Sequence, residues 1–151
     1  MATGSDALAR AIDDYYDRVL GVAYQVLGDA GLATRAAEHI FRRIGREHPR
    51  MQTDRASIWR VAGDVLRENI ARGYLVRPLR SDAAGWQATL IDDLARLAPE
   101  DRLLLLLRYH EGLDNVMLSR VWRADLKTIR EQVTQAQSRL SLTSDVAHAL
   151  R

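Results

Sequence analysis

The chain has 151 residues, of which 47% are hydrophobic and 28% charged, and its formal net charge at pH 7 is +2. This length allows one core or two small ones, and the low net charge excludes nucleic-acid binding driven by overall charge alone. The absence of cysteine excludes disulfide bonds and thiolate metal sites and is typical of the reducing cytoplasm. Because no apolar run reaches membrane-spanning length and the N-terminus lacks a signal-peptide pattern, we expect a cytoplasmic protein without membrane contact.

The N-terminal part of the chain predicts three amphipathic helices, because apolar residues recur there at three- and four-residue steps. These helices are expected over residues 6–27, 30–45 and 54–72. Thr53 or Asp54 can cap the third helix, and Gly73 can end it in a left-handed conformation. Short connections between the helices predict a compact three-helix bundle over residues 6–72.

The middle of the chain predicts a linker followed by two further helices. Residues 73–87 contain glycine, proline and serine without a helical period, which indicates a linker. A fourth helix is expected over residues 88–97. The next helix begins at Pro99, carries five consecutive leucines and ends at Gly112. So many leucines predict a helix that is buried on most sides.

The segment after Gly112 has the layout of a helix-turn-helix. A short helix is expected up to Trp122, then a break at Arg123 and Ala124, then a longer helix that Asp125 caps. The outer face of the longer helix carries Lys127, Thr128, Arg130, Gln132 and Gln135. The predicted fold is therefore all-α, with two small helical bundles joined by a linker and the helix-turn-helix in the second bundle, over residues 88–142.

Two parts of the sequence resemble extracytoplasmic-function (ECF) sigma factors of the sigma-70 family. Residues 97–113 read LAPEDRLLLLLRYHEGL, which resembles LPPEDRxxLLLRYxEGL in region four of that family, and residues up to Leu140 follow its helix-turn-helix more loosely. Residues 24–30 read YQVLGDA, which is similar to the LLGDxxDAED phrase of region two. Residues 41–44 fall on the FLRxW that follows, and residues 58–62 on the LxRIA of a later phrase. The resemblance covers roughly residues 8–142.

The resemblance implies binding partners and roles for particular residues. In that family, the first domain binds core RNA polymerase and melts the −10 element of promoter DNA, and the second domain reads the −35 element. By position, the residues implied to bind polymerase are Asp29, Glu38 and Phe41. Those implied to bind DNA are Arg60 near −10, and Lys127, Thr128, Arg130, Gln132 and Arg139 near −35. An anti-sigma factor is a further implied partner.

The chain departs from the family pattern where these contacts are expected. The acidic pair of DAED is Thr34-Arg35 here, the RN that follows RIA is Gly63-Asp64, and the turn glycine is Arg123. In the last helix, three basic positions are glutamine, at 132, 135 and 137, and a serine is Glu131. Each bidentate base contact that is lost weakens specific DNA binding by about 1–3 kcal/mol. Glutamine can still read adenine, so an altered DNA specificity stays open.

Three functional hypotheses follow. The first is an ECF-type sigma factor that binds core RNA polymerase and selects promoters. The second is a degenerate sigma-like interaction module that binds an anti-sigma factor, or polymerase, without reading DNA. The third is a helical dimer without a role in transcription, which would bury the face of Trp122 and Val133.

Catalysis and metal binding have no support in the sequence. There is no glycine-rich phosphate loop, no Gly-x-Ser-x-Gly motif and no carboxylate cluster with a positioned base. The four histidines lack the spacing of metal ligands. We therefore expect a protein that is not an enzyme, with no cofactor, no metal and no small-molecule substrate.

Overall fold

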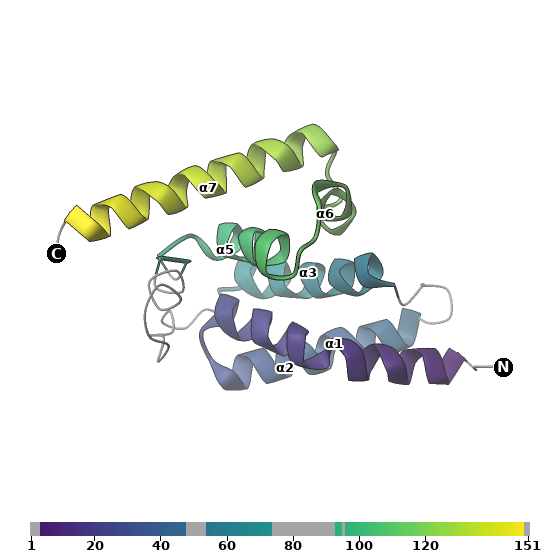
Figure 1. Cartoon of the computed structure of the whole chain (residues 1–151). Helices are drawn as coiled ribbons and strands as arrows, with labels where there is room; N and C mark the ends of the chain where they lie inside the picture. Colours follow the sequence, from purple (N-terminus) through teal and green to yellow (C-terminus); the bar gives the residue numbers. More distant parts are fainter. Residues whose placement is uncertain (1–3, 48–53, 74–92, 95, 150–151) are drawn as a thin grey trace.

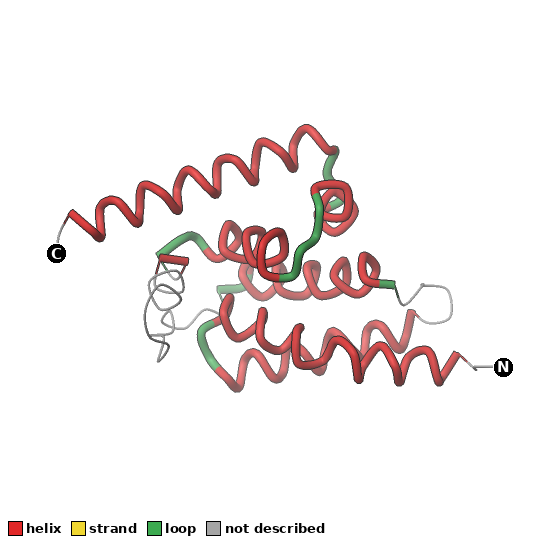
Figure 2. The backbone as a smooth tube through the Cα atoms, in the orientation of Figure 1, coloured by secondary structure: helices red, strands yellow, loops and turns green. Residues whose placement is uncertain are grey.

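The computed structural model describes residues 4–47, 54–73, 93–94 and 96–149, and the regular structure within these ranges is helical (Figures 1 and 2). The all-α prediction is confirmed. The helices are α1 (Gly4–Leu27), α2 (Ala30–Glu47), α3 (Arg55–Ala71), α5 (Pro99–Leu105), η1 (Leu106–His110), α6 (Asn115–Trp122) and α7 (Leu126–Ala149). Most of the predicted linker and the start of the predicted helix over residues 88–97 lie outside the described residues. Within the described ranges, no helix is both long and apolar enough to cross a membrane.

Aspartates set the starts of several helices. Asp29, Asp54, Asp114 and Asp125 each accept a hydrogen bond from the backbone N–H three residues later, at 2.7–3.0 Å. This bond satisfies one of the N–H groups that the first turn of a helix leaves without a partner. The predicted caps at Asp54 and Asp125 are confirmed.

The first three helices pack into a bundle, which we call the N-terminal bundle. Its core includes the side chain of Trp59, which is fully buried, and that of Phe41, which is 7% exposed. The rings of Phe41 and Tyr16 lie 5.6 Å apart between centroids and join α2 to α1. Aromatic contact of this kind stabilises a bundle beyond the apolar area that it buries.

The leucine-rich segment does not form the single regular helix that the sequence predicts. It begins as α5 at Pro99 and changes at Leu106 into one π-helical turn, η1, in which the Glu111 N–H donates to the Leu106 carbonyl at 3.0 Å. Gly112 then ends the segment at φ 71°, as predicted. A π-turn accommodates one residue more than an α-turn, and such turns occur often at functional sites.

The last two helices complete the C-terminal bundle, which consists of α5, η1, α6 and α7. Arg123 joins α6 to α7 in a left-handed conformation, at φ 53° and ψ 41°. One face of α7 is buried through Ile129, Val133 and Ala136, and the helix extends through the tail after Leu142 to Ala149. Because its opposite face is exposed, α7 lies on the surface of the molecule (Figure 1).

One hydrophobic core runs through both bundles. Buried residues of α1, α2 and α3 form a single cluster with those of α5, η1, α6 and α7. The main contact between the bundles is that of α3 with α6, and α1 also packs against α5 (Figure 1). The two bundles are therefore packed together in one closed body.

Candidate partner-binding groove

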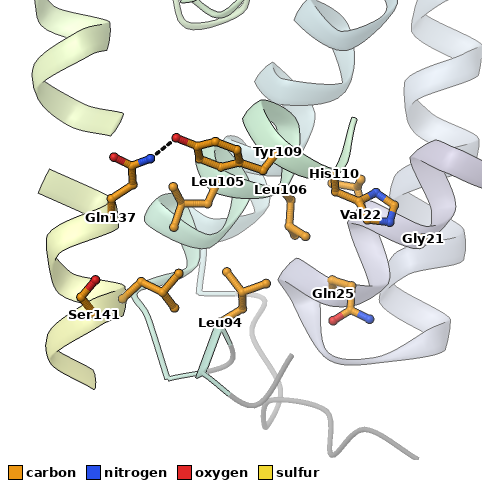
Figure 3. A pocket seen from close by; sticks show the side chains of 11 residues that line it. Gly21, Val22, Gln25, Leu94, Leu105, Leu106, Tyr109, His110, Gln137 and Ser141 are labelled. Carbon is orange, nitrogen blue, oxygen red and sulfur yellow. Dashed lines mark hydrogen bonds between the residues drawn. The ribbon is translucent and has the colours of Figure 1, made fainter. Parts of the chain in front are cut away.

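An apolar groove of about 820 Å³ lies where the two bundles meet on the side of α1 and α7. Figure 3 shows side chains from both bundles around this space. Helix α1 contributes Gly21, Val22 and Gln25 to the lining, and α7 contributes Gln137, Leu140 and Ser141. The rest of the lining is Leu94, which precedes α5, Leu105 of α5, and Leu106, Tyr109 and His110 of η1. The groove therefore exists only while the two bundles hold this arrangement.

The α1 wall of the groove is open because Gly21 has no side chain. A Cβ atom built on Gly21 would meet nothing within 4 Å. Glycine in the middle of a helix destabilises it by about 0.5–1 kcal/mol relative to alanine. Packing does not require Gly21, so the position leaves free space at the mouth of the groove.

The opposite wall is formed by the π-turn and α7. Leu105 and Leu106 supply apolar surface, while Tyr109 is 56% exposed. The side-chain amide of Gln137 donates a hydrogen bond to the Tyr109 hydroxyl, which ties α7 to η1 (Figure 3). An apolar floor with a few polar groups at the rim is the usual composition of a binding site.

A buried arginine beside the groove holds the walls in place. Arg102 of α5 is 5% exposed, and its guanidinium donates to the carbonyls of Gln25 and Val26 in the last turn of α1, at 3.0 and 3.1 Å. It also donates to the carbonyls of Leu94 and Leu97, at 2.9 and 3.0 Å. Carbonyls in the last turn of a helix lack helical partners, so Arg102 caps α1 from the other bundle. Burial lowers the pKa of Arg102, but a guanidinium still keeps its charge at neutral pH.

The predicted −35 contacts do not form a continuous positive strip. Lys127 and Arg130 are exposed, but Arg139 lies at 2.8 Å from Asp101 of α5 in an ion pair. Nine residues separate Arg130 from Arg139, and about 100° per residue places them on opposite sides of α7. Thr128 is half-buried and donates its backbone N–H to Asp125. The exposed Glu131 further reduces the positive charge beside Arg130.

The three glutamines that stand at basic positions of the family pattern face this protein's own helices. Gln132 and Gln135 line a cleft of about 190 Å³ between α7 and α5, and the Oε1 atom of Gln132 is buried there. Gln137 binds Tyr109 at the groove. Gln132 is half-buried, whereas Gln135 and Gln137 are exposed, so packing accounts for the neutral side chain at position 132 alone among the three.

The remaining predicted contacts lie in the N-terminal bundle. Arg60 is half-buried and pairs with Glu47 at 3.5 Å. Of the three residues predicted to bind polymerase, Glu38 is exposed, Asp29 caps α2 and Phe41 is buried in the core. The structure does not bring these residues together into one surface.

The groove itself was missed by the sequence reasoning. Five consecutive leucines cannot all face the core of their own bundle, and the exposed Tyr109 follows them closely. That excess of apolar side chains on one short segment was the available signal. Among the described residues, no group of three His, Cys, Asp or Glu side chains could hold a metal ion.

No protein-family model matches the sequence, and no curated protein matches it. Solved structures do match. A chain of the NMR structure of the PhyRSL–NepR complex from Sphingomonas sp. Fr1 is 19% identical, with a TM-score of 0.68 over 91% of this chain and 88% of that one. A chain of the co-crystal structure of the sigma factor RpoE in complex with the anti-sigma factor NepR from Bartonella quintana is 10% identical, with a TM-score of 0.73 over 91% and 96%. This likeness shows that the chain shares the all-α fold of these two chains.

Proposed function

We propose that the protein is a cytoplasmic sigma-like interaction module that binds an anti-sigma factor through the groove and does not read promoter DNA. The observation that carries the proposal is the apolar groove whose walls come from both bundles. The fold is shared with chains of two complexes that contain the anti-sigma factor NepR. A partner helix with an apolar face would cover the leucines of the groove floor and contact both bundles at once.

The closed arrangement of the two bundles supports binding of a protein partner rather than binding of promoter DNA. The −10 and −35 elements lie about 85 Å apart on straight B-DNA, at about 3.4 Å per base pair. A compact chain of this length has a radius of gyration of only about 15 Å. Both elements could be contacted together only if the two bundles separated.

The second candidate function is that of an ECF-type sigma factor that binds core RNA polymerase and reads promoters. It is favoured by Lys127 and Arg130, which are exposed near the start of α7. It requires the shared core to open, so that Val121 and Trp122 of α6, which are buried next to Gly63 and Arg67 of α3, would become exposed to solvent. Burying such side chains stabilises the closed form by roughly 1.5–3 kcal/mol each.

The proposal is tested by filling the groove. Gly21→Trp places a large ring at the mouth of the groove, where a new Cβ atom meets no neighbour, and Gly21→Ala is the matched control. We expect calorimetric titration with NepR from Bartonella quintana or Sphingomonas to show binding by the wild type. Binding should weaken at least tenfold in Gly21→Trp and change less than about twofold in Gly21→Ala.

Two results would contradict the proposal. One is the absence of binding to both NepR proteins. The other is binding that Gly21→Trp leaves unchanged. A duplex with a −35 element, titrated in parallel, separates the two candidate functions, because sequence-specific binding by the wild type would support the sigma factor instead.

A further inference from the structure

The contact between α3 and α6 is too close for any residue but glycine at position 63. A Cβ atom built on Gly63 would lie 2.8 Å from Cγ1 of Val121, and both residues are buried. Valine in a helix has one strongly preferred side-chain rotamer, so Val121 cannot easily turn away. Gly63 therefore allows the backbones of the two bundles to approach at this point.

A charged contact lies beside this close approach. Nη2 of Arg123 donates to Oδ2 of Asp64 at 3.0 Å, and Arg43 of α2 lies 3.7 Å from the same oxygen. The Asp64 side chain is 13% exposed, so water screens these pairs less than it screens fully exposed ones. Asp64 thus receives one arginine from each bundle.

The conformation of Arg123 directs its side chain toward Asp64. Among the described residues, Arg123 is the only one other than glycine with a positive φ. Arginine rarely adopts this conformation, so the surrounding contacts must hold it there. A second contact reinforces the interface, since the Arg67 guanidinium lies 5.2 Å from the centroid of the Trp122 ring and pairs with Glu100 of α5 at 3.2 Å.

We propose that Gly63, Asp64 and Arg123 form a latch that holds the two bundles in the closed arrangement. All three positions are also departures from the sigma pattern, and the structure brings them together although 59 residues separate Asp64 from Arg123. The latch acts at the α3–α6 contact, on residues that do not line the groove.

The latch sets the width of the groove. Gly21 and Leu140 belong to opposite walls and to different bundles, so their separation is fixed by the contact between the bundles. A groove formed before the partner arrives avoids the ordering that would otherwise weaken binding. This last step rests on the proposed function, whereas the latch itself does not.

The distance between the bundles can be measured in the protein alone. Because the chain has no cysteine, Arg42→Cys on α2 and Thr134→Cys on α7 provide two unique sites for spin labels, both exposed. We expect one narrow distance distribution in the otherwise wild-type chain. Gly63→Ala should add a second, longer population, because the new methyl group forces α3 and α6 apart.

Gly45→Ala is the matched control for Gly63→Ala. Both glycines lie within helices of the N-terminal bundle, but a Cβ atom on Gly45 would sit at an ordinary 3.6 Å from Leu8. The control should keep the narrow distribution. A Gly63→Ala protein with that same distribution would overturn the proposal.

The charged part of the latch is tested with Asp64→Asn and Arg123→Asn. Asparagine tolerates the left-handed conformation, so Arg123→Asn removes the ion pair with little change in backbone strain. Each variant should raise the ratio of open to closed molecules by on the order of fivefold. If Gly63→Ala lost its helical circular dichroism, the Asp64→Asn and Arg123→Asn variants would decide, and unchanged distances in both would reject the latch.

The two proposals fail in distinguishable ways. If the wild type binds no NepR but its latch variants open, the proposed function fails and the latch stands. If the wild type binds and opened variants bind NepR within twofold of the wild type, the link between latch and groove is wrong.

Discussion

Arg102 connects the two bundles through one buried side chain. Its guanidinium satisfies four backbone carbonyls, two of them in the last turn of α1. A planar fork with donors in several directions can do this, and an ammonium group cannot reach the same set. The LAPEDR phrase therefore has a structural role in this chain that its resemblance to sigma factors did not reveal.

Arg102→Lys should lower the free energy of unfolding by about 2–4 kcal/mol, because buried carbonyls would lose their donors. Urea denaturation followed by circular dichroism measures this change. Arg96→Lys is the control and should change stability by less than about 1 kcal/mol, because Arg96 is exposed and lysine keeps the positive charge that pairs with the buried Asp93. Equal effects of the two substitutions would mean that Arg102 is not a clamp.

Asp125 makes the stability of α7 depend on pH. Hydrogen bonds from the backbone and side chain of Thr128 lower the pKa of its carboxyl group below the ordinary value. A carboxyl with a lowered pKa in the folded state stabilises that state above its ordinary pKa, and this contribution disappears as the pH falls through the lowered pKa. Asp125→Asn keeps a capping oxygen but cannot titrate.

We therefore expect the wild type to be more stable than Asp125→Asn at neutral pH, with the difference shrinking in acid. Urea denaturation at a series of pH values checks this. A stability difference that stays constant from neutral to acidic pH would show that the aspartate charge has no part in the cap.

At the scale of elements, the sequence predicts the positions of most helices closely. It does not predict how the helices are connected and packed against one another. Hydrophobic periodicity and aspartate caps located α1, α2, α3 and the start of α7 to within a few residues, and Pro99 located the start of α5. The π-turn could not be predicted, because its hydrogen bond between Leu106 and Glu111 depends on how the leucines pack against the other bundle. The groove was missed for the same reason, since no periodicity within one segment reports which other segment will face it.

Two glycines, Gly21 within α1 and Gly112 after η1, should respond oppositely to substitution by alanine. Gly21→Ala is expected to raise the free energy of unfolding by about 0.5–1 kcal/mol, because α1 gains helix propensity without a clash. Gly112→Ala should lower it by about 1–2 kcal/mol, because φ is 71° where η1 ends. Thermal and urea denaturation of the two variants provide the comparison. Stabilisation by Gly112→Ala would contradict the described end of η1.

At the scale of the whole molecule, the low net charge and the closed arrangement of the two bundles both disfavour promoter recognition. The net charge is +2, and Arg139 lies on the opposite side of α7 from Arg130, where it pairs with Asp101. We expect the wild type to bind a −35 duplex no more than about threefold more tightly than an unrelated duplex, with an affinity in the non-specific range of roughly 10⁻⁴–10⁻⁶ M. Fluorescence anisotropy across a salt series measures both quantities.

Two arginines of α7 should contribute differently to the salt dependence of this weak DNA binding. Arg130→Ala should reduce the slope of affinity against salt by about one unit, because Arg130 is exposed on the outer side of α7. Arg139→Ala should leave the slope unchanged, because its charge is already paired with Asp101. A reduced slope in Arg139→Ala alone would show that the Asp101 pair opens to admit DNA.

The core that crosses both bundles makes the chain indivisible. A fragment ending near Gly73 would expose the side of α3 around Gly63, which α6 covers in the whole chain, and would be prone to aggregation. If either bundle were exchanged for its counterpart from a related protein, the close contact at Gly63 would be made with a surface that does not fit it. Chimeric chains joined at the central segment are therefore expected to be less stable than the native chain.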